Sequence, residues 1–306
     1  MKGLNSQFKM DIWRKKPFLK SLITLGIVTF LLFSAVWWIS SFIIKEDGDF
    51  AHRGKLALVR IEGVITESDD ITKQIKKYRE DPAVKGIILR IDSPGGAVGP
   101  SQEIYKEVLK TTGEKKVIAS MGGLAASGGY YIACATNRIF ANPGTITGSI
   151  GVIMAFSNIE DLMKKIGLKT VIIKSGKHKD IGSPVKELTD EERKILQDVS
   201  DDIHGQFIEA VAKGRSLNIE SVKELADGRI FSGKQAKEAK LVDELGTLED
   251  AISYAAKLTD IKGKPKILQE RKEKSFLLRL LKGDFSSLIP SPLDTKFLGA
   301  QYIWQY

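Results

Sequence analysis

The stretch that decides the fold is Met121-Gly-Gly-Leu-Ala-Ala-Ser127-Gly-Gly-Tyr-Tyr131. A strand-like run, KVIAS at residues 116–120, precedes it, and a helix-compatible run at residues 130–136 follows it. The small residues on both sides of Ser127 let a backbone or a substrate approach its hydroxyl closely. A serine at the start of a helix also faces unpaired N–H groups, which stabilise negative charge. The stretch therefore predicts a strand–turn–helix junction that holds either a nucleophilic serine beside an oxyanion site or an ordinary N-cap.

The chain on both sides of this junction alternates between strand and helix patterns. Strands are predicted at residues 56–65, 84–91, 116–120, 138–141 and 169–174. Helices are predicted at residues 69–80, 100–111, 125–136, 159–166, 189–214, 219–226, 233–239 and 248–258. Repeated β-α units with apolar strands predict one α/β domain, residues 55–262, with a mainly buried sheet.

Composition and charge narrow the class of protein. The 306 residues are 42% hydrophobic and 28% charged, which is ordinary for a globular protein. The formal net charge is +9, but +6 of it falls in residues 1–45, so nothing indicates a nucleic-acid partner for the domain. The one cysteine, Cys134, excludes an intramolecular disulfide and offers no zinc or redox motif. We expect Cys134 to be a core residue.

The N-terminal region has the pattern of a membrane anchor. Residues 22–44 are uncharged, mostly apolar and long enough to cross a bilayer as a helix, with Trp37 and Trp38 toward the far end. The positive-inside rule places the basic residues 1–21 in the cytoplasm and everything after the span outside. Bulky residues stand where a small-x-small cleavage site would follow, so we favour an uncleaved signal anchor over a cleavable signal peptide. Residues 45–54 form a polar linker.

The character of the chain changes again in residues 263–306. This segment begins charge-rich, continues with FLLRLL at residues 276–281 and ends with the aromatic sequence FLGAQYIWQY at residues 297–306. One interpretation is a partly ordered tail. The other is a docking segment that contacts the membrane, a neighbouring subunit or the protein's own cleft.

A serine nucleophile needs a base, and the loop SGKHKDIGSP at residues 175–184 offers two neighbouring candidates, His178 and Lys179. They correspond to a Ser-His-Asp triad or a Ser/Lys dyad. Neighbouring residues of an extended loop point in opposite directions, so only one of them is expected to face Ser127. A lysine acts as a base only when burial lowers its pKa from about 10.4 toward neutrality. A hydroxyl such as that of Ser149 would help to orient the amine.

A second glycine-rich turn, DSPGGA at residues 92–97, ends the strongest buried strand. Tandem glycines after a proline leave backbone N–H groups free to face a cleft. One of them, with the N–H of Gly128, would form a two-donor oxyanion hole; the alternative is an ordinary Pro-Gly turn. No phosphate-binding glycine motif occurs, so nucleotide binding is set aside.

Five motifs together resemble a known family. They are IDSPGG (91–96), ASGGYYIA (126–133), ANPGTITGSIGV (141–152), SGKHKDIGSP (175–184) and DGRIFSGKQAKEAKLVDELG (227–246). Their order and spacing over roughly residues 55–260 resemble the signal peptide peptidase SppA family, in its short single-domain bacterial form. The resemblance implies a fold related to the crotonase and Clp-protease superfamily. It also implies a homo-oligomeric Ser/Lys peptidase, without cofactor or metal, that cuts signal-peptide remnants and other apolar peptides at the membrane.

The same resemblance implies a role for each motif residue. Ser127 is the expected nucleophile, Lys179 the general base and Ser149 the group that holds the lysine amine. Gly96 and Gly128 are the expected oxyanion donors. Of the two candidate bases, the resemblance favours Lys179 over His178, because the family has no catalytic histidine.

The sequence departs from the family mildly, at Lys240, where a glycine is common before LVD. Two other functions fit the motifs less well than a peptidase does. An acyl-CoA enzyme of the crotonase type would share the fold and the oxyanion hole, but it has no use for a Ser/Lys pair or an external location. A non-catalytic membrane scaffold would not need the complete set of motifs.

Overall fold

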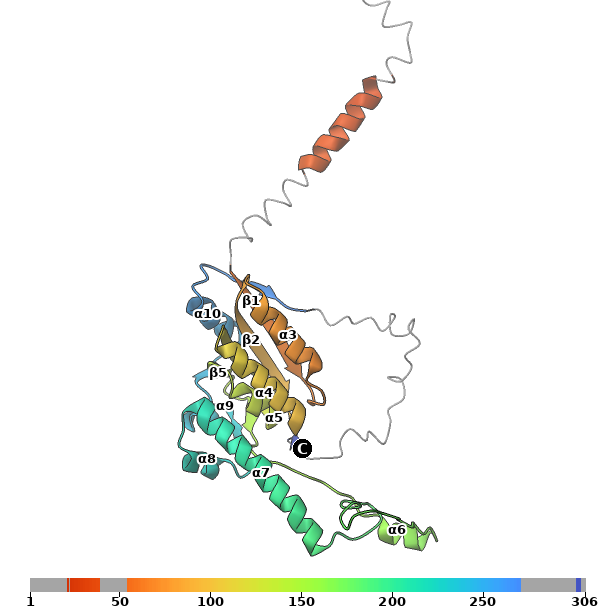
Figure 1. Cartoon of the computed structure of the whole chain (residues 1–306). Coiled ribbons are helices and arrows are strands. Elements are labelled where there is room, and N and C mark those ends of the chain that lie inside the picture. The colour runs from red at the N-terminus through yellow and green to blue at the C-terminus, as the bar shows by residue number, and fades with distance from the viewer. Residues whose placement is uncertain (1–20, 22, 39–53, 271–300, 304–306) are drawn as a thin grey trace, which may run out of the picture. The chain divides into compact units, whose positions relative to one another are not determined.

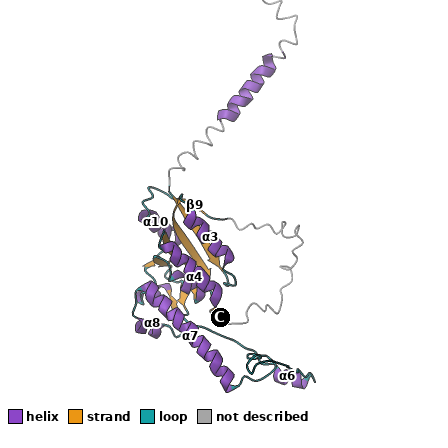
Figure 2. Cartoon of the chain, in the orientation of Figure 1, coloured by secondary structure: helices purple, strands orange, loops and turns teal. Residues whose placement is uncertain are grey.

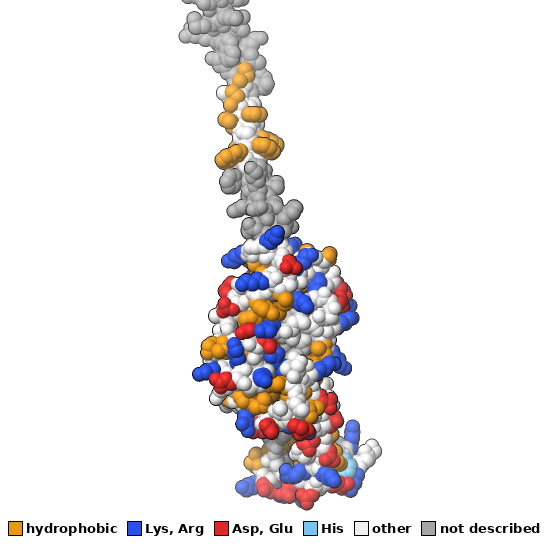
Figure 3. All heavy atoms as spheres, turned by 90° about the vertical axis from the view of Figure 1, so that its left-hand side faces the viewer, with side chains coloured by type: hydrophobic (Ala, Val, Ile, Leu, Met, Phe, Trp, Pro, Cys, Tyr) orange, Lys and Arg blue, Asp and Glu red, His pale blue; other side chains and the backbone are white. Residues whose placement is uncertain are grey.

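The computed structural model describes residues 21, 23–38 and 54–270 and the backbone of residues 301–303 (Figure 1). The chain divides into two units, Met1–Arg53 and Gly54–Tyr306. The first unit contains a helical segment at residues 21 and 23–38, whose apolar side chains are exposed (Figure 3). No helix among the described residues is both long and apolar enough to span a membrane. Residues 22 and 39–44 of the predicted anchor lie outside the described part, as do residues 1–20 and most of the predicted tail.

The second unit is built on a mostly parallel sheet around three long strands, β1 (Lys55–Glu62), β2 (Val84–Ser93) and β4 (Lys116–Ala126). The strand order is β7-β6-β4-β2-β1-β9, and in addition β5 pairs with β4 and β8 pairs with β5. All these pairs are parallel except β6 with β7. The shorter strands are β3 (Gly95–Ala97), β5 (Arg138–Ala141), β6 (Ile146–Gly148), β7 (Ile230–Ser232), β8 (Glu244–Leu245), β9 (Lys266–Leu268) and β10 (Gln301–Ile303). Strand β10 pairs with β3 in a separate two-stranded sheet. The predicted α/β class with a parallel sheet is confirmed.

Helices cover the sheet on both faces (Figures 1 and 2). They are α3 (Asp69–Glu80), α4 (Val98–Thr112), α5 (Gly128–Ala133), α6 (Glu160–Lys165), α7 (Asp190–Arg215), α8 (Ile219–Leu225), α9 (Gly233–Glu238) and α10 (Leu248–Leu258). Side chains alternate along each strand, so Val59 and Leu89 pack in the core under α3, α4 and α5. Leu58 and Ile88 point to the opposite face and pack against α10. Burial on both faces explains why these strands read as continuous apolar runs.

The prediction of a strand at residues 169–174 is wrong. These residues adopt no regular structure, and Val171 and Ile173 are 84% and 96% exposed. A strand is stable only when a neighbour satisfies its backbone hydrogen bonds, and none pairs with this run among the described residues.

The boundary between β4 and α5 lies later than the prediction placed it. Ala125 and Ala126 continue β4 and pair with Thr147 and Gly148 of β6, so the helix begins only at Gly128. Cross-strand pairing has overridden the helical propensity of the two alanines. As a result β4 extends directly to Ser127.

Two residues singled out in the sequence have simple structural explanations. Cys134 is 1% exposed, and burial raises the pKa of its thiol to about 12, so it is an inert core residue as predicted. Lys240 has φ 60°, in the left-handed region that favours glycine. That backbone conformation explains why a glycine suits the position where this chain has lysine.

Candidate active site

Ser127 lies between the end of β4 and the start of α5 in a strained backbone conformation, φ 52° and ψ −117°. Positive φ is uncommon for a residue with a side chain, and such strain gathers at functional sites. Two backbone hydrogen bonds hold it in place. The Ser127 N–H donates to the Gly148 carbonyl at 2.8 Å, and the Ser127 carbonyl accepts from the Tyr131 N–H at 2.8 Å. These hydrogen bonds therefore fix the backbone of Ser127 to β6 on one side and to α5 on the other.

The Ser127 side chain is 1% exposed, and its Oγ has no hydrogen-bond partner in the described part of the chain. The alternative interpretation, an ordinary N-cap, is wrong, because the hydroxyl makes no capping hydrogen bond to α5. Buried hydroxyls without a partner are rare in folded proteins and call for an explanation. A nucleophile whose base is supplied from elsewhere is one such explanation.

The two glycine turns meet beside Ser127. A β-carbon added to Gly128 would lie 2.6 Å from Ser101 Oγ and 3.3 Å from the Gly96 nitrogen. A β-carbon on Gly96 would lie 2.0 Å from the Ile65 carbonyl oxygen. Only residues without side chains permit this approach, which brings the backbones of the two expected oxyanion donors together.

Two buried serines that the sequence analysis missed fasten this turn. Ser93 Oγ donates to the Gly63 carbonyl at 2.6 Å and accepts from the Gly95 N–H at 3.1 Å. Ser101 Oγ donates to the Ala97 carbonyl at 2.9 Å. The signal for Ser93 was present, because a serine before Pro-Gly often hydrogen-bonds the backbone of its own turn.

Ser149 follows the glycine whose carbonyl accepts the Ser127 N–H. It is 7% exposed with φ 50°, and its own N–H donates to the Arg229 carbonyl at 2.8 Å. Thr147 Oγ1 donates to the Ala125 carbonyl at 2.7 Å and so fastens β6 to β4. Ser149 is thereby held next to the segment that carries Ser127.

Lys179 lies apart from these residues within one chain. It belongs to residues 153–189, here called the arm, which contains α6 and extends away from the sheet (Figure 1). The Lys179 side chain is exposed, and no hydrogen bond joins it to Ser127. His178 is also on the arm, where its Nε2 lies 3.4 Å from Glu191 Oε1. One chain thus assembles every expected site residue except the base.

The loop that carries Lys179 has a defined shape despite its exposure. Asp180 Oδ1 accepts from Lys174 Nζ at 2.5 Å and lies 3.1 Å from Lys186 Nζ. Hydrogen bonds from these two lysines, that from Lys174 first, lower the pKa of Asp180 to about 2. Lys186 Nζ also donates to Glu192 Oε1 at 2.5 Å, which ties the loop to the first turn of α7.

The arm exposes an unusual amount of apolar surface. Nine large hydrophobic side chains on it are at least 40% exposed. They are Ile153, Phe156, Ile159, Leu162, Ile166, Leu168, Val171, Ile172 and Ile173. Exposed apolar side chains in this number on one segment are typical of an interaction site.

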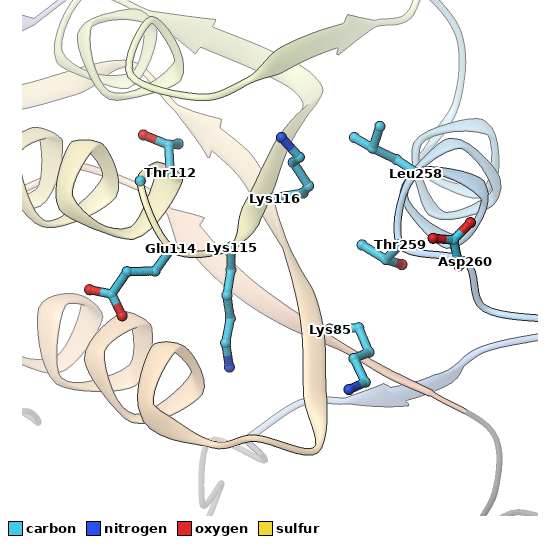
Figure 4. A pocket seen from close by; sticks show the side chains of 9 residues that line it. Lys85, Thr112, Glu114, Lys115, Lys116, Leu258, Thr259 and Asp260 are labelled. Atoms are coloured by element: carbon cyan, nitrogen blue, oxygen red, sulfur yellow. The ribbon is translucent and has the colours of Figure 1, made fainter.

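A pocket near the amino ends of β2 and β4 is not part of this site. Lys85, Lys115 and Lys116 contribute to its lining (Figure 4), whereas Ser127 follows the carboxyl end of β4. Figure 4 shows the Lys85 and Lys116 side chains pointing in different directions. Lys115 Nζ donates to two backbone carbonyls, those of Tyr78 and Asp81. The three lysine side chains therefore do not point to one common position in the pocket.

The α/β fold, with a buried serine at a strand–helix junction beside paired glycine turns, is that of a serine hydrolase. Comparison with known proteins narrows the class of hydrolase, because the sequence profile of peptidase family S49 matches residues 110–262. A protein of Synechocystis sp. assigned as a protease is 46% identical over 238 residues, which cover 77% of this chain and 86% of the relative. The chain belongs to peptidase family S49 and is a serine peptidase, which confirms the resemblance to the SppA family.

Two further relatives agree. A protein of Enterococcus faecium assigned as signal peptide peptidase SppA is 39% identical over 232 residues, covering 70% of this chain and 67% of the relative. Protease 4 of Salmonella typhi is 36% identical over 219 residues, covering 68% of this chain but only 35% of that longer protein.

Proposed function

We propose that the protein is a membrane-anchored endopeptidase that degrades cleaved signal peptides and other apolar peptides on the extracytoplasmic side of the membrane. The observation that carries the catalytic part is the state of Ser127 beside the two glycine turns. Its backbone is strained, its side chain is buried, and its hydroxyl has no hydrogen-bond partner in the part of the chain that the structure describes. The relative assigned as a signal peptide peptidase supports the substrate class.

The proposed reaction is acyl transfer to Ser127 followed by hydrolysis. Ser127 Oγ attacks the peptide carbonyl while the neutral Lys179 amine takes its proton. The N–H groups of Gly96 and Gly128 stabilise the oxyanion of the tetrahedral intermediate. As the peptide C–N bond breaks, the lysine returns the proton to the leaving amine. The lysine then removes a proton from water, which attacks the acyl carbon. As the ester C–O bond breaks, the lysine returns that proton to Ser127 Oγ, which restores the free enzyme and releases the carboxylic acid.

The proposed base comes from a second copy of the chain. Ser127 Oγ has no hydrogen-bond partner among the described residues, and Lys179 lies on an exposed arm with nine exposed apolar side chains. A homo-oligomer in which one copy's arm packs against the next would bury that apolar surface and desolvate the lysine. Ser149, held beside the nucleophile, would orient the incoming amine.

The membrane anchor is proposed on the sequence of residues 22–44, uncharged and flanked by basic residues on the cytoplasmic side. The helical segment at residues 23–38, with its exposed apolar side chains, is compatible with it. Alkaline carbonate extraction tests it. The full chain should stay in the membrane pellet, whereas a chain starting at Gly54 should be released; release of both would exclude the anchor.

Peptide cleavage by four proteins tests the dyad. The wild type, Ser127→Ala, Lys179→Ala and His178→Ala would be assayed on a fluorogenic apolar peptide as a function of pH. We expect Ser127→Ala and Lys179→Ala to be inactive and His178→Ala to be active. The wild-type rate should rise from neutral to alkaline pH, because only the unprotonated amine accepts the serine proton. An active Lys179→Ala with an inactive His178→Ala would replace the dyad with a histidine-based site.

A further inference from the structure

Strand β4 changes its neighbour shortly before it reaches Ser127. Residues 118–120 of β4 pair with β5, whereas residues 124–126 pair with β6. Strand β6 ends at Gly148, whose carbonyl accepts the Ser127 N–H. The change of neighbour therefore decides which segment lies beside the serine.

A bulge in β4 lies where the neighbour changes. On its other edge β4 pairs with β2, and Ile91 of β2 lies opposite Met121. The next pair is Ser93 with Ala125, so between these pairs β2 has one residue and β4 has three. A regular pairing would carry Ser127 two residues further along β2, about 6–7 Å beyond its observed place. The bulge thus sets how far along the sheet the serine lies.

A buried threonine holds the backbone of the bulge. Thr145 Oγ1 donates to the carbonyl of Gly122 at 2.7 Å. The same hydroxyl accepts from the Asn142 N–H at 3.1 Å, which fastens the bulge to the turn between β5 and β6. Thr145 is 1% exposed, so its side chain is not available to a substrate.

Two charged side chains of β2 hold the bulge from the opposite side. Asp92 Oδ1 accepts from the Leu124 N–H at 3.1 Å. A β-carbon added to Gly122 would lie 2.7 Å from the carboxyl carbon of Asp92, so this side chain crosses the bulge directly against the glycine. Arg90 Nη1 donates to the carbonyl of Met121 at 2.9 Å. Side chains from two different segments therefore fix the shape of the bulge.

We propose that Thr145 and Asp92 are positioning residues of the peptidase, which hold the bulge in the shape that sets Ser127 between Gly96 and Gly148. The inference rests on the proposed role of Ser127 as the nucleophile. Bulges next to active sites re-aim a side chain or end a pairing, and this one does both. A reacting group misplaced by about 1 Å can lose about 10²-fold in rate, so neither residue needs to touch the peptide.

Thr145→Val tests the buried contact with a side chain of similar size. The variant leaves the Gly122 carbonyl without its hydroxyl donor, so the bulge should relax and Ser127 should lose its alignment. We expect kcat of the full chain on an apolar peptide to fall about 10- to 100-fold, with KM close to the wild-type value. Thr145→Ser restores the hydroxyl and should restore most of kcat.

Thr111→Val is the matched control. Thr111 is also buried, and its Oγ1 donates to the Glu107 carbonyl at 2.8 Å near the end of α4, away from Ser127. Both valine variants should lose stability in urea, but Thr111→Val should keep the wild-type kcat. Equal losses of kcat in the two variants would overturn the proposal, because the loss would then follow stability and not the bulge.

Variants of Asp92 test the exposed contact, and the exposure of this residue means that they should fold. Asp92→Ala should lower kcat several-fold at every pH, because the Leu124 N–H loses its acceptor. Asp92→Asn should keep most of kcat, because its amide oxygen can accept the same N–H. Equal losses in the two variants would overturn the positioning role and show that the negative charge itself acts.

Hydrogen exchange separates this proposal from the assignment of the nucleophile. Residues 121–131 should exchange faster in Thr145→Val than in the wild type, and at the wild-type rate in Thr111→Val. If Ser127→Ala cleaved peptides normally while exchange in Thr145→Val increased, the proposed nucleophile would fail and the hold on the junction would stand. If Ser127→Ala were inactive while Thr145→Val kept the wild-type kcat, the positioning proposal alone would fail.

Discussion

At the scale of the residue, the site depends on backbone conformations that ordinary residues avoid. Ser127 and Ser149 both have positive φ, and the two lie on segments joined by the hydrogen bond from the Ser127 N–H to the Gly148 carbonyl. The glycines opposite them bring two backbones into contact. The chain sustains this strain because β4, β6 and α5 fix the junction on every side.

The strained backbone at Ser127 predicts that a glycine variant is more stable than an alanine variant, which is the reverse of the usual order. Ser127→Ala and Ser127→Gly should both abolish peptide cleavage, but the glycine variant should be the more stable by about 1 kcal/mol, because glycine tolerates positive φ. At an ordinary position glycine is the less stable by about 0.5–1 kcal/mol. Urea denaturation of the two variants measures the difference. An alanine variant as stable as the glycine variant would show that the conformation stores no strain.

Close packing at Gly96 predicts a loss of activity on the addition of one methyl group. Gly96→Ala places a β-carbon 2.0 Å from the Ile65 carbonyl oxygen, so β3 must move. We expect kcat/KM to fall by about 10²–10³, as when an oxyanion donor is displaced. Gly99→Ala is the control, because nothing lies within 4 Å of its added β-carbon and it sits in α4. That variant should keep full activity and gain about 0.5–1 kcal/mol of stability.

At the scale of the element, the arm is the part of the domain that its own core does not hold. Helix α6 has no buried residue, and the apolar run after it pairs with no strand among the described residues. Charged side chains from Lys174 to Glu192 give the loop its shape instead. An element ordered by ion pairs and carrying exposed apolar side chains is suited to docking on another molecule.

The ion pairs of Asp180 predict how the arm responds to mutation and pH. Asp180→Asn removes the partner of Lys174 and Lys186 and should lower kcat several-fold while global stability changes little. The control is Asp161→Asn, which removes the exposed ion pair with Lys164 and should change neither kcat nor global stability. Because the pKa of Asp180 is lowered to about 2, its contribution to loop order is present above about pH 4. It is lost as pH falls toward 2.

Hydrogen exchange of the loop measures this order. Protection at residues 174–186 should hold from pH 8 down to about pH 4 in the wild type and be lower in Asp180→Asn throughout. Unchanged protection in that variant would mean that other contacts order the loop.

At the scale of the whole molecule, a single chain does not bring the expected nucleophile and the expected base together. Ser127 and the glycine turns belong to the packed core, whereas Lys179 belongs to the arm. The second unit exposes mixed basic and acidic side chains on the face in Figure 3, without a field of one sign. The exposed apolar side chains of the arm therefore favour apolar contact as the mode of the proposed assembly.

Mixing two inactive variants tests the assembly. Ser127→Ala retains the lysine and Lys179→Ala retains the serine, so a mixed oligomer contains sites with both residues if the base comes from a second copy. At equal ratio, random assembly should restore up to about a quarter of the wild-type rate. Each variant alone, dissociated and reassembled in the same way, is the control. No recovery in demonstrated mixed oligomers would place both residues of the dyad in one chain.

The sequence by itself determined the features that depend on neighbours along the chain. Hydrophobic periodicity located the main strands and most helices. The start of the helix predicted at residue 189 coincides with a local motif, the Thr189–Glu192 capping box, whose two hydrogen bonds measure 3.1 and 3.2 Å. The small residues around Ser127 and Gly96 identified the strand–turn–helix junction and the glycine turn. These signals are local, so no knowledge of the tertiary structure was needed.

Only the tertiary structure decided which distant segments pair. It extended β4 to Ala126 by giving it β6 as a neighbour, and it left residues 169–174 without one. It placed Lys179 apart from Ser127 and paired β10 with β3. Propensity cannot foresee such outcomes, because a strand exists only with its partner and the partner is selected by contacts far apart in sequence.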